Sequence, residues 1–121
     1  MTDRELLELA AKAAKIDVLF REDIGYFCTV TKRIHEKIFC GIDTEWNPLE
    51  DDGDALQLAV KLSINIQHET LARLPFEETV NCGLYGENSP EWCEEIKGND
   101  PYTATRRAIV RAAAEIGKDM K

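Results

Sequence analysis

The stretch Trp46–Leu62, WNPLEDDGDALQLAVKL, places an aromatic residue, a proline and a run of acidic residues directly before an apolar pattern. In that pattern, apolar residues recur at i, i+3, i+4 and i+7, which is the spacing of one face of an α-helix. The spacing predicts a well-buried helix that begins after the acidic run. The residues of this face are Ala55, Leu58, Ala59 and Leu62, and Leu56 and Val60 make it wider.

The acidic residues ahead of this helix have two interpretations. Carboxylates at a helix start can cap its first N–H groups and interact with the positive end of its dipole. Clustered carboxylates also suit a divalent cation, although this spacing does not match an EF-hand loop. We predict that Asp51 or Asp52 caps the helix, with a metal site as the alternative, and we predict no cofactor. The group comprises Glu45, Glu50, Asp51, Asp52 and Asp54.

Capping does not explain the segment Trp46-Asn47-Pro48. The proline restricts Asn47 to an extended conformation. Trp46 is predicted either to plug the core under this loop or to form a flat surface on which a ligand stacks. Asn47 and Asp54 are candidate partner-binding residues beside it.

Two further helices are predicted at the ends of the chain. The first begins with a capping box, Thr2 to Glu5. The last has Asp100 as N-cap, Pro101 at its first position and Gly117 as its stop. Their apolar stripes are Leu6, Leu9, Ala10 and Ala13 in the first helix, and Ala108, Ile109, Ala112, Ala113 and Ile116 in the last.

Between these helices the apolar period changes to two, which is typical of strands. The short links between the first three strands predict an antiparallel meander. Residues 85–99 are predicted to form a long loop, with one helical turn at Ser89-Pro90. The predicted strands are 17–21, 26–30, 37–42, 63–69 and 78–86.

The element order α-β-β-β-α-β-β-α predicts a single α+β domain spanning residues 1–121. Amphipathic helices need an apolar face to cover. We therefore expect a mainly antiparallel sheet of about five strands packed with three helices, similar to an α/β/α sandwich.

Composition excludes several classes of protein. The 121 residues have a net charge of −8, which repels phosphate backbones and argues against direct nucleic-acid binding. The N-terminal segment mixes charged with apolar residues, so it is not typical of a signal peptide. Nothing in the composition favours a membrane span. We expect a cytosolic protein, and the sequence does not indicate its oligomeric state.

The cysteines are predicted to be reduced thiols. Cys28, Cys40 and Cys82 fall on the apolar side of predicted strands, where a small buried thiol fits. Cys93, beside Trp92 in the predicted loop, is the only one expected to be reactive. The alternative is a zinc site that includes His35 and His68, but no two cysteines have the close spacing of structural zinc ligands.

Arg106 and Arg107 lie in the first turns of the last helix, where they are candidates for binding a phosphate group. Trp92 or Trp46 would then stack a nucleotide-like ligand. The alternative is an ordinary solvated face, in which Arg111 forms an i, i+4 pair with Glu115.

Two stretches carry a family resemblance: Trp46-Asn47-Pro48 running into residues 51–55, and TRRAIVRAAAEIG, Thr105 to Gly117. Together they resemble the small bacteriophage-encoded proteins of the phage ABA sandwich domain family. In that family, a segment with Trp and Pro leads into one helix and an Ala-rich helix closes the chain. The resemblance implies a phage accessory protein acting in the host cell cytoplasm, and it implies no catalytic residues.

Three functions remain as hypotheses. The first is a non-enzymatic protein, such as a defence inhibitor, that binds a host or phage protein through an acidic surface. The second is a nucleotide sponge that uses Trp46 or Trp92 with Arg106 or Arg107. The third is a metal-dependent enzyme on the acidic cluster, although no Gly-rich phosphate loop and no Ser-His-Asp set is present. No catalytic residue is predicted.

Overall fold

The computed structural model describes residues 2–22, 25–34, 37–71, 77–84 and 92–120, and the backbone alone at 26, 29–34, 37–44, 70–71 and 77. Three helices and antiparallel strands are present in this part of the chain, which confirms the α+β class. The elements, in order, are α1 (Asp3–Ala14), β1 (Val18–Arg21), β2 (Tyr26–Ile34), β3 (Lys37–Trp46), α2 (Asp52–Leu62), β4 (Asn65–Leu71), β5 (Glu77–Gly83), β6 (Cys93–Ile96) and α3 (Pro101–Asp119).

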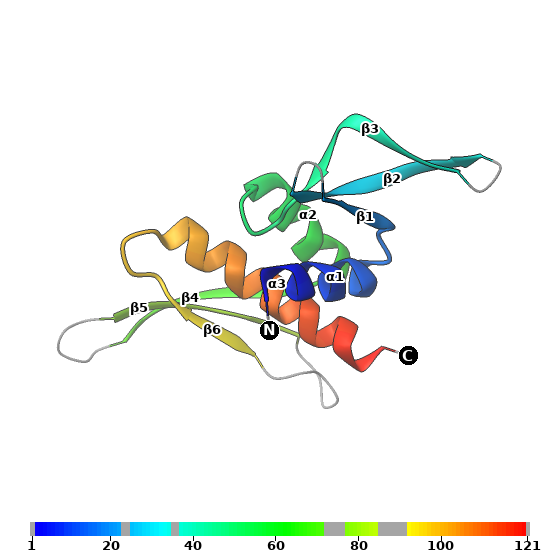
Figure 1. The fold of residues 1–121 in the computed structure, drawn as a ribbon. Coiled ribbons are helices and arrows are strands. Elements are labelled where there is room, and N and C mark those ends of the chain that lie inside the picture. Colours follow the sequence, from blue (N-terminus) through cyan, green and yellow to red (C-terminus); the bar gives the residue numbers. More distant parts are fainter. Residues whose placement is uncertain (1, 23–24, 35–36, 72–76, 85–91, 121) are drawn as a thin grey trace.

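The strands form two separate antiparallel sheets of three strands each, in the orders β1-β2-β3 and β4-β5-β6. The first of these confirms the predicted meander. The helices lie between the two sheets (Figure 1). The layer order therefore differs from the expected α/β/α sandwich, because the strands divide into two sheets that each turn one face toward a shared helical layer.

The sixth strand, β6, lies where the sequence predicted a loop. Its backbone pairs with β5 from Thr79 opposite Ile96 to Cys82 opposite Cys93. The helical turn predicted at Ser89-Pro90 lies outside the described residues.

The predicted helix starts are confirmed by their caps. The Thr2 side chain accepts a hydrogen bond from the backbone N–H of Glu5, and the Asp51 side chain accepts one from the N–H of Asp54. Asp100 accepts bonds from two N–H groups at the start of α3, which has Pro101 in its first turn. Among the described helices, none is both long enough and apolar enough to cross a membrane.

The predicted end of the last helix is wrong. Gly117 does not stop α3, which continues to Asp119. Its backbone lies so close to α1 that an added Cβ would overlap the carbonyl oxygen of Leu9. Gly117 is therefore required for the close packing of α1 against α3. The sequence pattern had predicted a helix stop at this glycine instead.

The core lies where the three helices meet the inner faces of both sheets. Most of the buried residues of α1 and α3 are alanines, and the two helix backbones approach closely at Gly117. From the first sheet, Phe27 and Trp46 face each other across β2 and β3 and are both buried. The second sheet contributes Val80 and Cys82, and α2 contributes Leu58.

One face of α2 departs from the sequence-based expectation. Ala55, Leu58 and Ala59 are buried as predicted. Leu56 and Val60, which were expected to widen the buried face, are 59% and 71% exposed. The apolar arc of α2 is therefore wider than the surface available to cover it.

The cysteines with described side chains, Cys28, Cys82 and Cys93, are buried and form no disulfide bond. This confirms the prediction for Cys28 and Cys82. Cys93, which the sequence predicted to be the only reactive cysteine, is buried as well, because it lies in β6 opposite Cys82. The side chain of Cys40 and all of His35 lie outside the described residues.

We expect these three thiols to resist modification in the native protein. Burial, and next the neighbouring Cys93, raise the pKa of Cys82 to about 12. At pH 8 this leaves about one Cys82 thiol in ten thousand as the reactive thiolate. Ellman's reagent should modify Cys28, Cys82 and Cys93 only after denaturation. Rapid native labelling of Cys28, Cys82 or Cys93, located by mass spectrometry, would contradict this burial.

Candidate binding pocket

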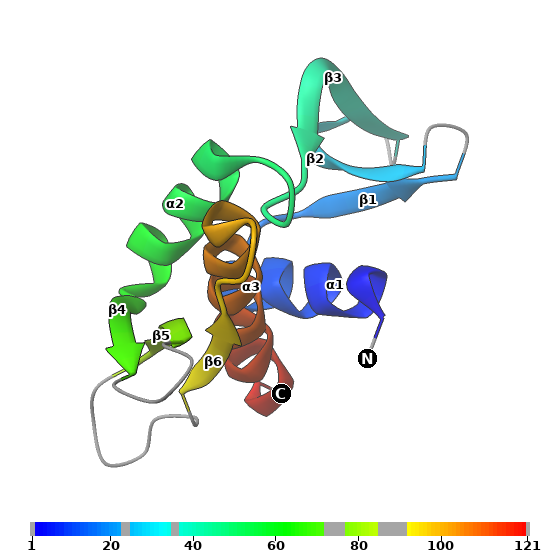
Figure 2. The same cartoon turned by 90° about the vertical axis from the view of Figure 1, so that its left-hand side faces the viewer.

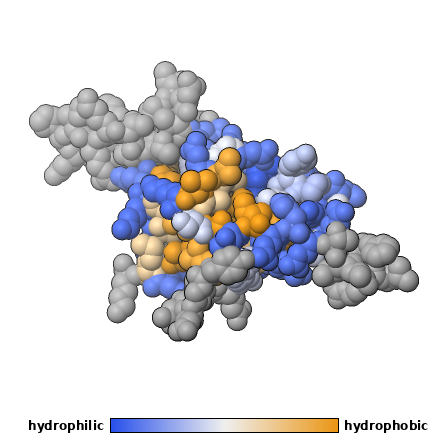
Figure 3. Space-filling model, turned by 180° about the vertical axis from the view of Figure 1, so that it is seen from behind, coloured by the Kyte–Doolittle hydropathy of each residue, from blue (hydrophilic) through white to orange (hydrophobic). Residues whose placement is uncertain are grey.

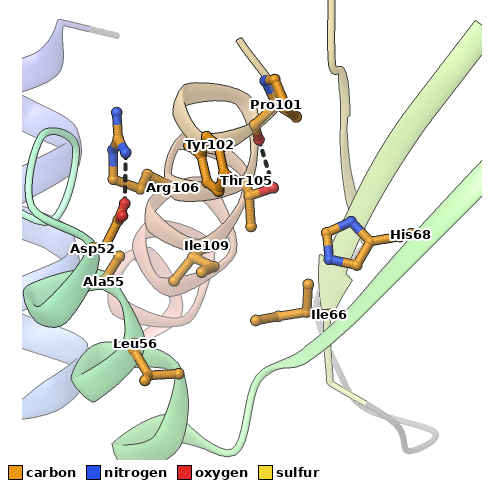
Figure 4. A pocket seen from close by; sticks show the side chains of 10 residues that line it. All are labelled: Asp52, Ala55, Leu56, Ile66, His68, Pro101, Tyr102, Thr105, Arg106 and Ile109. Carbon is orange, nitrogen blue, oxygen red and sulfur yellow. Dashed lines mark hydrogen bonds and ion pairs between the residues drawn. The ribbon is translucent and has the colours of Figure 1, made fainter.

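An apolar cavity lies between α2, β4 and the first turns of α3. Figure 2 shows α2 and β4 along one side of α3. The cavity has a volume of about 450 Å³, which is within the range of small-ligand sites. Its lining residues, hereafter the apolar pocket, are Asp52, Ala55, Leu56, Ile66, His68, Pro101, Tyr102, Thr105, Arg106 and Ile109 (Figure 4).

Each element contributes to the pocket through its own periodicity. On α3, Tyr102, Thr105 and Ile109 follow helical spacing, so they line one side of that helix. On β4, Ile66 and His68 are two residues apart and therefore share one face of the strand. Ile109 is buried and forms part of the floor.

The mouth of the pocket exposes large apolar side chains. Leu56, on α2, is 59% exposed, and Tyr102, at the start of α3, is 68% exposed. Each lies at the edge of the cavity (Figure 4). Exposed apolar area beside a concave apolar surface is typical of a binding site.

The charged residues at one end of the pocket are paired with each other. Arg106 donates from Nη1 to the Asp52 carboxylate at 2.6 Å, from Nε to the Leu49 carbonyl at 2.9 Å and from Nη2 to the Thr103 hydroxyl at 3.0 Å. Its side chain is only 16% exposed. Arg106 therefore ties the start of α3 to the loop before α2, and its charge is neutralised where it lies.

Two other polar side chains of the pocket differ in their hydrogen bonding. The Thr105 hydroxyl donates to the Pro101 carbonyl at 2.7 Å, within its own helix. The imidazole of His68 has no hydrogen bond or ion pair among the described residues, and it points toward the pocket (Figure 4). Among the described residues, His68 is thus a polar side chain of the pocket that no hydrogen bond or ion pair occupies.

Asn47 and Asp54, two predicted site residues, hold the turn that leads into α2. The backbone N–H of Asn47 donates to the Asp54 carboxylate at 2.9 Å, and the Asn47 side-chain oxygen accepts from the N–H of Leu49 at 3.1 Å. Burial, and less strongly the nearby Asp51 charge, raise the pKa of Asp54, while the bond from Asn47 lowers it. Both polar side chains are therefore occupied by local structure.

The acidic residues before and at the start of α2 stabilise the fold through different contacts. Asp51 caps α2 and Asp52 pairs with Arg106. This confirms the capping interpretation. Among the described residues, no three His, Cys, Asp or Glu side chains are grouped in a way that could hold a metal ion.

The two tryptophans do not share a site. Trp46 is 5% exposed, which confirms the core-plug interpretation and leaves no accessible ring face for stacking. Trp92 is half-buried, and its ring lies against Gly83, while its indole N–H donates to the Leu84 carbonyl at 3.2 Å. They lie in separate parts of the fold, one at the end of β3 and one beside the second sheet.

Arg107 and Arg111 pair with acidic residues in other elements. Arg107 contacts Asp3 at 3.2 Å and Glu95 at 3.4 Å. Arg111 contacts Glu95 at 3.2 Å rather than the predicted partner Glu115. These arginines, whose side chains are 41% and 38% exposed, therefore pair with acidic residues of α1 and β6 while they remain partly solvated.

The start of α3 also provides a titratable cap. The hydroxyl and then the N–H of Thr103 donate to Asp100, and these bonds lower its pKa below the ordinary value of 3.8, against a smaller opposing effect of desolvation. The pKa of Asp100 is lower in the folded protein than in the unfolded chain. Its ionised carboxylate therefore stabilises the fold at pH values above the unfolded-state pKa, and this stabilisation is lost as the pH falls through the folded-state pKa.

An Asp100→Asn variant should therefore lose less stability on acidification than the parent, because asparagine still caps a helix but does not titrate. Urea unfolding followed by circular dichroism from neutral pH to pH 3 measures this difference. Equal dependence on pH in both proteins would show that Asp100 contributes nothing to acid sensitivity.

No family model, curated protein or solved structure matches this chain. The resemblance to phage ABA sandwich proteins therefore stays a prediction. Of the six predicted site residues, Arg106 alone lines the apolar pocket. Sequence reasoning missed Leu56, Ile66, His68 and Tyr102, and the excess apolar width of α2 was the one signal that could have indicated an exposed surface.

Proposed function

We propose that this protein is a non-enzymatic binding protein that attaches to a partner protein through the apolar pocket and its exposed mouth. The observation that supports this most strongly is the exposure of Leu56 and Tyr102 beside a cavity of about 450 Å³. Figure 3 shows an apolar area on one face of the molecule, bordered by hydrophilic residues. Surfaces of this kind are typical of interaction sites.

The chemistry of the pocket supports binding over catalysis. Arg106 is held by Asp52, and Thr105 is bonded within its helix. His68, which lines the pocket with Asp52 and Thr105, makes no hydrogen bond with either of them among the described residues. A nucleophilic side chain is normally activated by a base within hydrogen-bond reach, and no such pair is present among the described pocket residues.

The net charge supports a basic partner. At −8 the protein attracts positively charged proteins over long range, which increases the rate of association more than its final strength. The resemblance to phage accessory proteins adds a host protein in the bacterial cytoplasm as the class of partner.

The nucleotide alternative has less support. Trp46 is buried, and Arg106 and Arg107 both have carboxylate partners. The first N–H groups of α3, where a phosphate would bind, are occupied by Asp100.

We expect Leu56→Asp to abolish capture of the partner from bacterial lysate. Aspartate would place a charge at the mouth of the pocket, and exposed substitutions of this kind change folding stability little. Ile96→Asp is the matched control, because Ile96 is 60% exposed but lies on β6, outside the pocket. Quantitative mass spectrometry of captured proteins measures the effect.

Salt should also weaken capture, since it screens the attraction between exposed charges. The proposal is wrong if the parent, the Leu56→Asp variant and the Ile96→Asp variant all retain the same proteins. Circular dichroism and melting temperature establish that both variants remain folded.

A further inference from the structure

The edge of β4 is unprotected when compared with the other sheet edges. In the described part of the chain, β5 is the only strand that pairs with β4, and the seven residues of β4 pair without a register shift. The edge strands β1 and β6 have four residues each, and the pairing of β3 with β2 is irregular at two points. Short length and irregularity are the usual protections of an edge against further pairing.

The composition of β4 also leaves its edge open to pairing. The strand NIQHETL contains no proline and no lysine, and its one acidic residue is Glu69. Native edge strands commonly carry lysine or proline because these residues oppose the addition of another strand. Among the four edges, β4 alone combines length, regular register and low charge.

The apolar pocket lies beside this edge. Within the second sheet, Ile66 and His68 of β4 line the pocket, and no residue of β5 or β6 does. On its other side is Leu56 of α2 (Figure 4). A strand hydrogen-bonded to β4 would lie about 4.8 Å from it and would turn alternate side chains toward the face where Ile66 and His68 lie.

We propose that β4 and the apolar pocket form one site for an extended peptide of a partner protein, which adds to the second sheet as a fourth strand. This proposal rests on the proposed function and specifies how the partner binds. Backbone hydrogen bonds to β4 provide attachment, and one large aliphatic or aromatic side chain fills the pocket beside Leu56 and Tyr102. Peptide recognition by strand addition combines these two contributions.

Charge defines the flanks of this peptide. Near the C-terminal end of β4, Glu69 and Glu78 are exposed. Asp52 is 70% exposed at the pocket, and its partner Arg106 is mostly buried. Lysine or arginine beside the anchor side chain is therefore favoured. A second copy of this chain also has a net charge of −8, so the two copies would repel each other. This repulsion disfavours pairing of β4 with the β4 strand of another copy.

The test begins with a random peptide library selected on the native, full-length protein. Each enriched peptide is then synthesised in two forms, N-methylated at every odd or at every even position. Only one edge of an extended peptide can pair with β4, so one form should bind at least about tenfold more weakly while the other retains most of its affinity. Fluorescence anisotropy measures both affinities.

Two variants place the peptide on the molecule. Leu56→Asp should weaken binding of the unmethylated peptide at least about tenfold, whereas Ile96→Asp should leave it unchanged. Amide hydrogen exchange should show new protection in β4 on peptide binding. The enriched sequences should carry a large apolar residue next to lysine or arginine.

The outcomes separate this proposal from the proposed function. If the peptides need Leu56 for binding but bind equally well in both methylated forms, the strand-addition proposal is wrong. The proposed function, binding of a partner at the apolar pocket, would then still hold. Absence of any Leu56-dependent peptide would overturn both. A concentration-dependent dimer, detected by light scattering and disrupted by Leu56→Asp, would identify a second copy as the occupant and overturn the peptide.

Discussion

Replacing Gly117 with alanine should destabilise the protein by about 3 kcal/mol, near the upper end of the usual cost of overpacking a core. The added Cβ would overlap the carbonyl oxygen of Leu9 and lie 2.9 Å from the carbonyl carbon. These are backbone atoms of α1, so they cannot move aside as the end of a side chain can. The better helix propensity of alanine returns at most about 1 kcal/mol.

Gly53→Ala is the matched control, because Gly53 is also a helical glycine but lies in the exposed first turn of α2. The nearest atom to its added Cβ would be the side-chain Oδ1 of Asp51, at 3.1 Å. We expect this variant to lose much less stability than Gly117→Ala, because the end of the Asp51 side chain can shift by a few tenths of an ångström, whereas the backbone of Leu9 cannot. Urea unfolding gives both free energies, and similar values for the two variants would refute the proposed contact between α1 and α3.

The same glycine shows which part of the fold the sequence could predict. Helix starts depend on local hydrogen bonds, so Thr2, Asp51 and Asp100 could be identified as caps from their neighbours alone. Gly117 has the local appearance of a helix stop, yet its role depends on Leu9, more than one hundred residues earlier. No local pattern reports a contact over that distance.

The missed strand has a similar cause. Residues 93–96 have the sequence CEEI, which shows no clear alternation of apolar and polar residues. They are extended because their backbone groups pair with β5 and because Arg107 and Arg111 bind Glu95 from α3. Tertiary partners override weak local propensity in this segment.

The pocket could be predicted only in part, because it combines residues from three elements. Helical spacing placed Ala55 and Ile109 on inward faces correctly. It could not show that the sheet leaves part of α2 uncovered, which is why Leu56 and Val60 were assigned to the core. Leu56 and Val60 are exposed because the strands divide into two small sheets. The number of predicted strands does not show that they divide in this way.

Replacing Trp46 with alanine should cost about 3–5 kcal/mol, the usual range for removing a buried large aromatic side chain. Trp46 is 5% exposed and faces Phe27 across the first sheet, and both belong to the core shared with the helices. Its loss would leave a cavity where the end of β3 packs against the helical layer. Trp46→Phe should cost less, because it keeps much of the aromatic volume.

Tyr102→Ala is the control for this last comparison, since Tyr102 is 68% exposed and its removal should change stability by no more than about 0.5 kcal/mol. Tyr102 and Trp46 should therefore have opposite effects in two assays. Loss of Tyr102 should weaken capture of the partner and spare folding, whereas loss of Trp46 should lower the free energy of unfolding. If Trp46→Ala folded as stably as the parent but lost a bound ligand, Trp46 would be a stacking surface and its place in the core would be wrong.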